Sequence, residues 1–123
     1  MNTIERFQRD SEFYIEEGCH ITELHNSTAD PDCSIARARL EPGRATRLHC
    51  LRGIVERYVI LEGCAEVRTG NETLQTVQPL DVVNIPAGVA QNIVNTGPSD
   101  LIFLCICTPR FSAVHYQGLE EQD

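Results

Sequence analysis

The chain has 123 residues, which is enough for one domain with a core and hardly enough for two. Its ten basic side chains are all Arg, and its eighteen acidic side chains leave a formal net charge of −8. A chain this acidic repels the phosphates of nucleic acids and of anionic membranes, so we expect neither as a partner. It contains no apolar run of the roughly 20 residues that a membrane helix needs, and its N-terminus lacks a signal-peptide pattern. We therefore expect a cytoplasmic protein.

Apolar and polar residues alternate with a period near two along most of the chain, which predicts short β-strands. The predicted strands cover residues 21–24, 34–40, 46–51, 55–61, 65–68, 74–77, 81–85, 91–94 and 101–108. Turn signals rich in Gly, Pro and Asn separate these strands, and this regular spacing is typical of an all-β sandwich or barrel. We expect a single domain over 1–123, with an N-terminal extension over 1–18. A C-terminal tail over 113–123 is expected to be short helix or frayed chain.

The six Cys residues do not form the framework of a disulfide-stapled protein. Cys105 and Cys107 lie two residues apart in a predicted strand, so both face the same side of it. No C-x-x-C pair occurs, which removes the zinc-ribbon and thioredoxin-like patterns. We expect six free thiols, most of them buried.

Two segments place polar side chains on strand faces that are otherwise apolar. In the first, His49 and Leu51 share one face of a strand, and Glu56 and Tyr58 share a face of the next. Two adjacent antiparallel strands would direct His49 and Glu56 toward the same interior point. In the second segment, the inward residues include Gln91.

An interior Glu56 needs an ion, an Arg or a shifted pKa, because an unpaired buried carboxylate is costly. Arg37, Arg39 and Arg47 are the candidate cations. Tyr58 is either a pocket hydroxyl or an aromatic filler. Gln91 is either a metal ligand or an amide that lines the interior.

These two segments resemble the two motifs of the cupin superfamily over most of the chain, from about residue 34 to residue 108. The residues that match the motifs by type and spacing are Gly43, His49, Glu56, Gly63, Pro86, Gly88 and Asn95. The resemblance implies a double-stranded β-helix, or jelly-roll barrel, whose mouth holds a divalent metal on three His and one Glu. Three positions depart from the pattern. Leu51 and Gln91 stand where two of the His ligands belong, and Leu80 replaces a Gly.

The ligands that remain for a divalent metal are His49, Glu56 and Gln91. Such a set is weaker than a full cupin set and would accept Mn, Fe, Ni or Zn with added waters. One carboxylate leaves the site with residual positive charge, which favours a small anionic molecule rich in oxygen. Asn95 is a turn residue in the family pattern.

Three functions remain open at this point. The first is a metal-dependent enzyme of the dioxygenase, decarboxylase or isomerase type. The second is a metal-free isomerase or lyase, in which His49 and Glu56 form a general acid–base pair assisted by Tyr58. The third is a module that binds a small ligand without chemistry.

The strand over 34–40 carries Arg37 and Arg39 on one face and Ala36, Ala38 and Leu40 on the other. We expect the Arg face to point outward, away from the barrel interior. The family resemblance and the apolar residues of the N-terminal extension, Phe7, Phe13 and Tyr14, indicate a homodimer.

Overall fold

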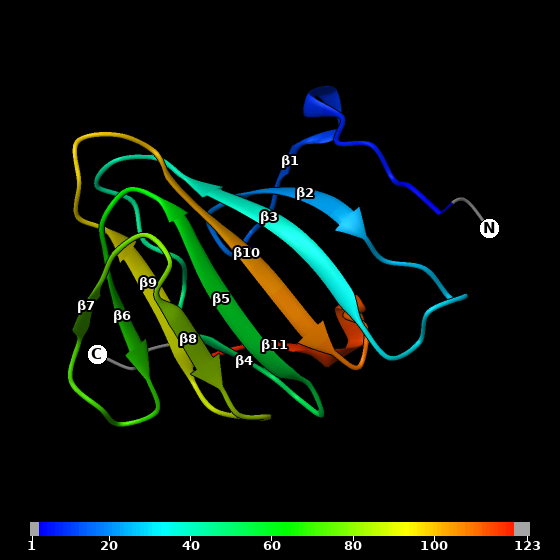
Figure 1. Cartoon of the computed structure of the whole chain (residues 1–123). Coiled ribbons are helices and arrows are strands. Elements are labelled where there is room, and N and C mark those ends of the chain that lie inside the picture. Colours follow the sequence, from blue (N-terminus) through cyan, green and yellow to red (C-terminus); the bar gives the residue numbers. More distant parts are fainter. Residues whose placement is uncertain (1–2, 120–123) are drawn as a thin grey trace.

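The computed structural model describes residues 3–119, which form two antiparallel β-sheets packed face to face (Figure 1). The first sheet has the strand order β1-β2-β3-β10-β5-β8, and the second has the order β11-β4-β9-β6-β7. Their bounds are β1 Phe13–Tyr14, β2 His20–His25, β3 Ser34–Leu40, β4 His49–Leu51, β5 Val55–Glu62, β6 Ala65–Thr69, β7 Gln75–Val77, β8 Val82–Ile85, β9 Gln91–Asn95, β10 Leu101–Thr108 and β11 Tyr116–Gly118. Sequential strands repeatedly pass from one sheet to the other. This architecture is the predicted double-stranded β-helix.

All nine predicted strands are present, and two further strands lie outside the predicted set. Strand β1 has two residues and pairs with β2, whereas β11 pairs with β4 through Tyr116 and Leu51. The tail predicted from residue 113 therefore differs from expectation: a short helical turn over Ala113–His115 leads into a paired strand. Such short strands carry no periodicity of their own and form because a neighbouring strand offers its edge. The predicted frayed end at 120–123 lies outside the described residues.

The core is divided into two apolar clusters, and this division leaves room for a cavity. The larger cluster fills the middle of the barrel, where the rings of Tyr58 and Phe103 pack with their centroids 4.7 Å apart. The smaller cluster consists of Leu51, Ile54 and Cys107, with Phe111 and Tyr116 packed against it.

The outer face of β3 holds the N-terminal segment in place. Arg39 donates to Glu12 through Nε and Nη2, at 3.0 and 2.7 Å, and Arg37 donates to the same carboxylate at 3.3 Å. Arg39 also donates to Asp100. The outward orientation expected for both Arg residues is therefore confirmed. Because this contact fixes Glu12, the chain that follows can turn inward and carry Ile15 and Glu17 to the cavity.

One departure from the family motif, Leu80 in place of Gly, has a cost in backbone conformation. Leu80 has a φ of +75°, and it is the one non-Gly residue within 3–119 with positive φ. The motif has Gly at this position, and Gly adopts such a conformation without steric cost. Leu80 is 80% exposed, so its side chain obtains little packing energy in return. At Gly63, by contrast, the motif residue is kept: φ is +93°, and an added Cβ would lie 3.0 Å from the Asp100 carbonyl.

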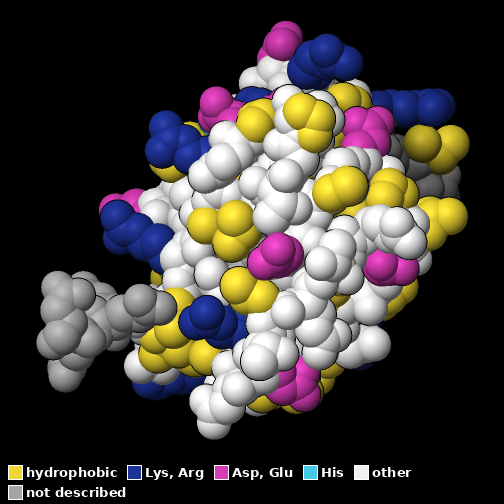
Figure 2. All heavy atoms as spheres, turned by 90° about the vertical axis from the view of Figure 1, so that its left-hand side faces the viewer, with side chains coloured by type: hydrophobic (Ala, Val, Ile, Leu, Met, Phe, Trp, Pro, Cys, Tyr) yellow, Lys and Arg dark blue, Asp and Glu magenta, His cyan; other side chains and the backbone are white. Residues whose placement is uncertain are grey.

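The surface seen from the side of β6 and β7 carries apolar, acidic and basic side chains intermixed (Figure 2). Within residues 3–119, no helix has the length and apolar character required to cross a membrane.

Candidate active site

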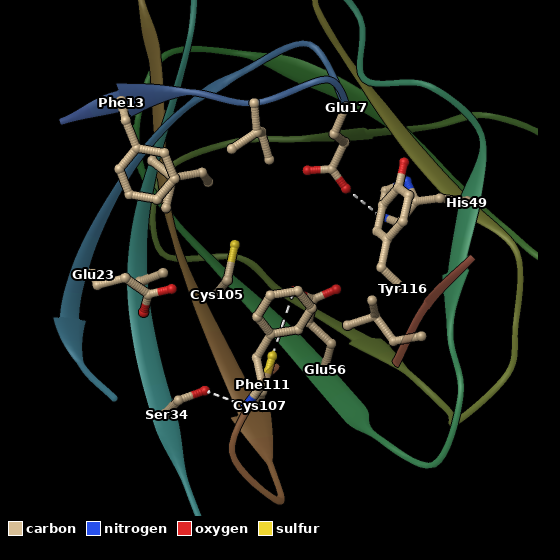
Figure 3. Close-up of a pocket in the computed structure, with 14 residues that line it drawn as sticks. Phe13, Glu17, Glu23, Ser34, His49, Glu56, Cys105, Cys107, Phe111 and Tyr116 are labelled. Atoms are coloured by element: carbon tan, nitrogen blue, oxygen red, sulfur yellow. Dashed lines mark hydrogen bonds and ion pairs between the residues drawn. The ribbon is translucent and has the colours of Figure 1, made fainter. Parts of the chain in front are cut away.

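One cavity, of about 110 Å³, lies between the two sheets at the end of the barrel that β4, β5 and β10 share (Figure 3). Both sheets and both terminal segments contribute to its wall. The residues that line it are Phe13, Ile15, Glu17, Ile21, Glu23, Ser34, Ala36, His49, Leu51, Glu56, Cys105, Cys107, Phe111 and Tyr116. His49 and Glu56 thus face one interior space, as the sequence predicted. The expected pairing of their strands is wrong, however, because β4 and β5 belong to opposite sheets and the two side chains meet across the barrel interior.

His49 is held by contacts at both ring nitrogens. Its Nδ1 donates to the carbonyl oxygen of Arg47 at 2.7 Å, so Nε2 is the nitrogen that faces the cavity. This Nε2 lies 2.5 Å from Oε1 of Glu17. The ring of Tyr116 stacks on the imidazole with centroids 5.2 Å apart and planes inclined by 20°. The imidazole is 1% exposed and has one orientation.

The charge of Glu17 determines the protonation of His49. Burial by itself would lower the pKa of His49, but the contact with Glu17 and its negative charge outweigh burial, and the net pKa is raised. A proton is therefore held between Nε2 and the Glu17 carboxylate. The Sγ of Cys19 also lies 3.4 Å from the other oxygen of Glu17.

Glu56 is the buried acid of the site, at 7% exposure, and no Arg side chain lines the cavity around it. Its Oε2 accepts a contact from Sγ of Cys107 at 3.7 Å, while Oε1 has no hydrogen-bond partner among the described residues. Burial, and after it the negative charge of Glu17, raise its pKa to about 7; Gln91, His49 and Cys107 act in the opposite direction. Glu56 can therefore exchange a proton near neutral pH.

Gln91 and Tyr58 are close to the predicted site but do not line the cavity. His49 and Gln91 are paired across β4 and β9, and both are buried. The Tyr58 hydroxyl donates to Oε1 of Gln91, while Gln91 Nε2 has no hydrogen-bond partner among residues 3–119. His49, Glu56 and Gln91 thus converge inside the barrel. Tyr58 is a packed aromatic residue of the core, and its hydroxyl group has Gln91 as its hydrogen-bond partner.

The residues present do not fit the three-ligand metal site without rearrangement. The Gln91 oxygen is already an acceptor for Tyr58, and His49 Nε2 is paired with Glu17. A separation of 2.5 Å is that of a hydrogen bond, whereas two ligands at about 2.1 Å on adjacent positions of an octahedral ion lie about 3 Å apart. Within residues 3–119, no group of three or more His, Cys, Asp or Glu side chains is placed to hold a metal ion.

The cavity wall contains three acidic side chains, and His49 is its one basic side chain. Glu17, Glu23 and Glu56 face the space from different sides (Figure 3). All ten Arg residues belong to the described part of the chain, and none lines this cavity. Arg37 and Arg39 are bound to Glu12 on the outside. Of the three means of compensation considered for Glu56, an ion, an Arg or a shifted pKa, no Arg lines the cavity and the pKa is raised.

Comparison with solved structures shows the fold of this chain in proteins of several activities. A predicted oxalate decarboxylase of Thermotoga maritima is 29% identical, with a TM-score of 0.68 over 74% of this chain and 80% of that one. Pac13, a nucleoside dehydratase, has a TM-score of 0.76 at 13% identity over 95% and 92% of the two chains. The cupin domain of Schizosaccharomyces pombe Cnp3 has a TM-score of 0.69 at 16% identity over 79% and 69%.

Neither protein-family models nor curated protein sequences gave a match.

Proposed function

We propose that this chain, which has the cupin fold, is a small-molecule enzyme of the isomerase or lyase type that works by proton transfer. The observation that carries the proposal is the hydrogen-bonded Glu17–His49 pair facing Glu56 across one small, mostly apolar cavity. Buried acid and base groups with displaced pKa values are typical of such sites. The fold accommodates this chemistry, since Pac13 is a dehydratase.

Glu56 acts as the base in this scheme, and His49 acts as the acid. Ionised Glu56 lines the cavity and removes a proton from carbon through Oε1, which has no hydrogen-bond partner among the described residues. Protonated His49 donates its Nε2 proton to the oxygen where charge develops, and Glu17 stabilises the imidazolium before transfer. In an isomerase the proton returns at a second atom of the substrate. In a lyase the protonated oxygen leaves as water, after which solvent takes the proton from Glu56 and returns one to Nε2 of His49.

Hydrogen exchange with solvent tests the proposal directly. The protein is incubated in D₂O with small hydroxy and keto compounds, and deuterium incorporation or loss of water is followed by NMR. Glu56→Gln and His49→Asn should each lower the rate by about 10²–10⁴-fold. Glu62→Gln, an exposed carboxylate on the same strand as Glu56, is the matched control and should retain the rate. A variant at Glu56 or His49 with the control's rate would refute the assignment.

A divalent-metal enzyme is the second candidate, favoured by the unpartnered Oε1 of Glu56 so close to an imidazole. In this alternative, His49, Glu56 and Gln91 would hold the ion after His49 separates from Glu17. Metal analysis of protein purified without chelator tests it. His49→Ala should abolish occupancy, and Gln91→His should raise affinity. Equal metal content in all three proteins would exclude this site.

The homodimer expected from the sequence remains a prediction. Phe13 and Tyr14 are 48% and 63% exposed on β1, an edge strand of the first sheet. A second copy that covers this edge would bury both rings. Sedimentation equilibrium measures the oligomeric state: the wild type should be a dimer, and Tyr14→Ser should shift the equilibrium toward the monomer.

A further inference from the structure

We propose that the cavity selects a small ammonium-bearing molecule with an apolar body, and that it rejects carboxylates and phosphates of similar size. This inference names the substrate class of the proposed enzyme and therefore rests on the proposed function for its catalytic meaning. The binding preference itself follows from the cavity wall alone. It reverses the expectation of an anionic ligand, which depended on the positive charge of a bound metal.

The first argument is the charge of the wall. Glu17, Glu23 and Glu56 line the cavity, whereas every Arg of the chain lies elsewhere and the chain has no Lys. The Glu17 charge is offset by the proton shared with His49. Glu23 and Glu56 have no such partner in the wall. An anion that entered would meet negative charge without a compensating cation, in surroundings where charges interact strongly.

The second argument is the position of Glu23 relative to the cavity opening. Glu23 and Phe13 both line the cavity and are both exposed, so they stand at its open side. Glu56 is 7% exposed and lies at the inner end. A cation would therefore meet one carboxylate on entry and a second one inside. Burial raises the pKa of Glu23, and the hydrogen bond with Asn26 and the charge of Arg110 act in the opposite direction.

The third argument is the aromatic lining. Phe13, Phe111 and Tyr116 contribute three rings to the cavity wall, and no Arg or Lys side chain of the protein occupies the space between them. The faces of such rings attract ammonium groups, and the attraction grows when water is excluded. The remaining wall consists of small and branched apolar side chains such as Ile21 and Leu51, which suit a short hydrocarbon body.

The volume of about 110 Å³ limits the body to a few carbon atoms. It is smaller than the engineered cavity of about 150 Å³ that accommodates benzene. We therefore choose probes with a five-carbon branched skeleton that differ only in the charge of the end group. These are 3-methylbutylamine, 3-methyl-1-butanol and 3-methylbutanoate.

The test is an NMR titration of the ¹⁵N-labelled protein with each probe at about pH 8, where the amine is a cation and the acid an anion. EDTA in the buffer ensures that the charge measured is that of the chain. We expect the amine to bind at least about tenfold more tightly than the carboxylate, with the alcohol between them. The shifts should map to β2, β5 and β10 around the cavity. A carboxylate or alcohol that binds as tightly as the amine would overturn the inference, as would shifts located elsewhere.

Variants that remove one carboxylate each distinguish the effect of charges in the cavity wall from that of the protein's overall negative charge. Glu23→Gln should weaken the amine several-fold and strengthen the carboxylate, and Glu56→Gln should do the same. Glu62→Gln removes the same charge from the exposed end of β5, away from the cavity wall, and should leave both affinities unchanged. Equal effects of Glu23→Gln and Glu62→Gln would refute selection by the wall. If the NMR spectrum of Glu56→Gln shows that this variant is unfolded, the affinities of Glu23→Gln decide the test, because Glu23 is exposed and its replacement leaves the core intact.

The two proposals fail in different measurements. Amine binding with no deuterium exchange in any bound amine would refute catalysis and support the ligand class. Exchange that proceeds in a hydroxy acid, with the carboxylate bound more tightly than the amine, would refute the ligand class and support catalysis.

Discussion

Replacing Glu56 by Gln changes how the stability of the fold depends on pH, because Glu56 is buried with a displaced pKa. Its pKa rises from an ordinary value of 4.5 to about 7 in the folded chain. At about 1.4 kcal/mol per pKa unit, the ionised carboxylate costs the fold about 3 kcal/mol relative to the protonated one. A raised pKa means that the folded state holds the proton more tightly. Its contribution to stability is complete below pH 4.5 and is lost as pH rises toward 7 and beyond.

The measurement is urea unfolding of the wild type, Glu56→Gln and Glu62→Gln at several values between about pH 5 and pH 8. Relative to Glu56→Gln, the free energy of unfolding of the wild type should fall by about 2–3 kcal/mol over this range. The other titratable groups that act on Glu56 are Glu17, His49 and Cys107, and they are present in both proteins, so the difference isolates Glu56. Glu62→Gln should run parallel to the wild type. A constant difference between wild type and Glu56→Gln would show that the pKa of Glu56 is not raised on folding, and would refute its role as a base that titrates near neutral pH.

Three further predictions concern stability and thiols. Leu80→Gly should raise the free energy of unfolding by up to about 1 kcal/mol, because it relieves a φ of +75° at an exposed side chain; thermal unfolding measures it. Asn95→Ala should lower it by about 2–4 kcal/mol, since Asn95 donates to the carbonyls of Leu40 and Ser99 and accepts from the Gly97 amide. All six Cys are free thiols in the structure, so titration of denatured, unreduced protein should report six, and a result of two or fewer would contradict this.

The fold could be predicted from the sequence because its determinants are local. Alternation along each strand and the Gly and Pro turns specify which side chains are buried, and the spacing of His49, Glu56 and Gln91 specifies that they meet. The outward face of Arg37 and Arg39 follows from the same alternation, since Ala38 and Leu40 take the inner face and are fully buried. Asn95 lies in its turn, as the motif implied.

The partner of His49 could not be predicted in the same way. Glu17 lies outside any strand, in a segment where Glu16 and Glu17 are adjacent and only one turns inward. Its position depends on the contact of Glu12 with Arg39 and on the pairing of β1 with β2, which are long-range features. Tyr116 reaches the cavity because β11 pairs with β4, and Phe111 is held there by the hydrogen bond that its backbone amide donates to Oγ of Ser34. A sequence pattern with no period offers no signal for such contacts.

The loss of two imidazoles and the gain of a carboxylate form one consistent change in the chemistry of the site. Three imidazoles and one carboxylate leave a divalent ion with one net positive charge, whereas His49 with Glu17 and Glu56 supplies two negative charges and one basic nitrogen. A proton on Nε2 of His49 neutralises Glu17 at hydrogen-bond distance, and burial allows Glu56 to be protonated near pH 7. Protons can thus perform the charge compensation that a metal performs in the full ligand set. Unlike a metal, they can be transferred to a substrate. A cavity compensated by protons carries no positive charge of a metal, so the proposed acid–base site and the proposed preference for an ammonium ligand have one physical origin.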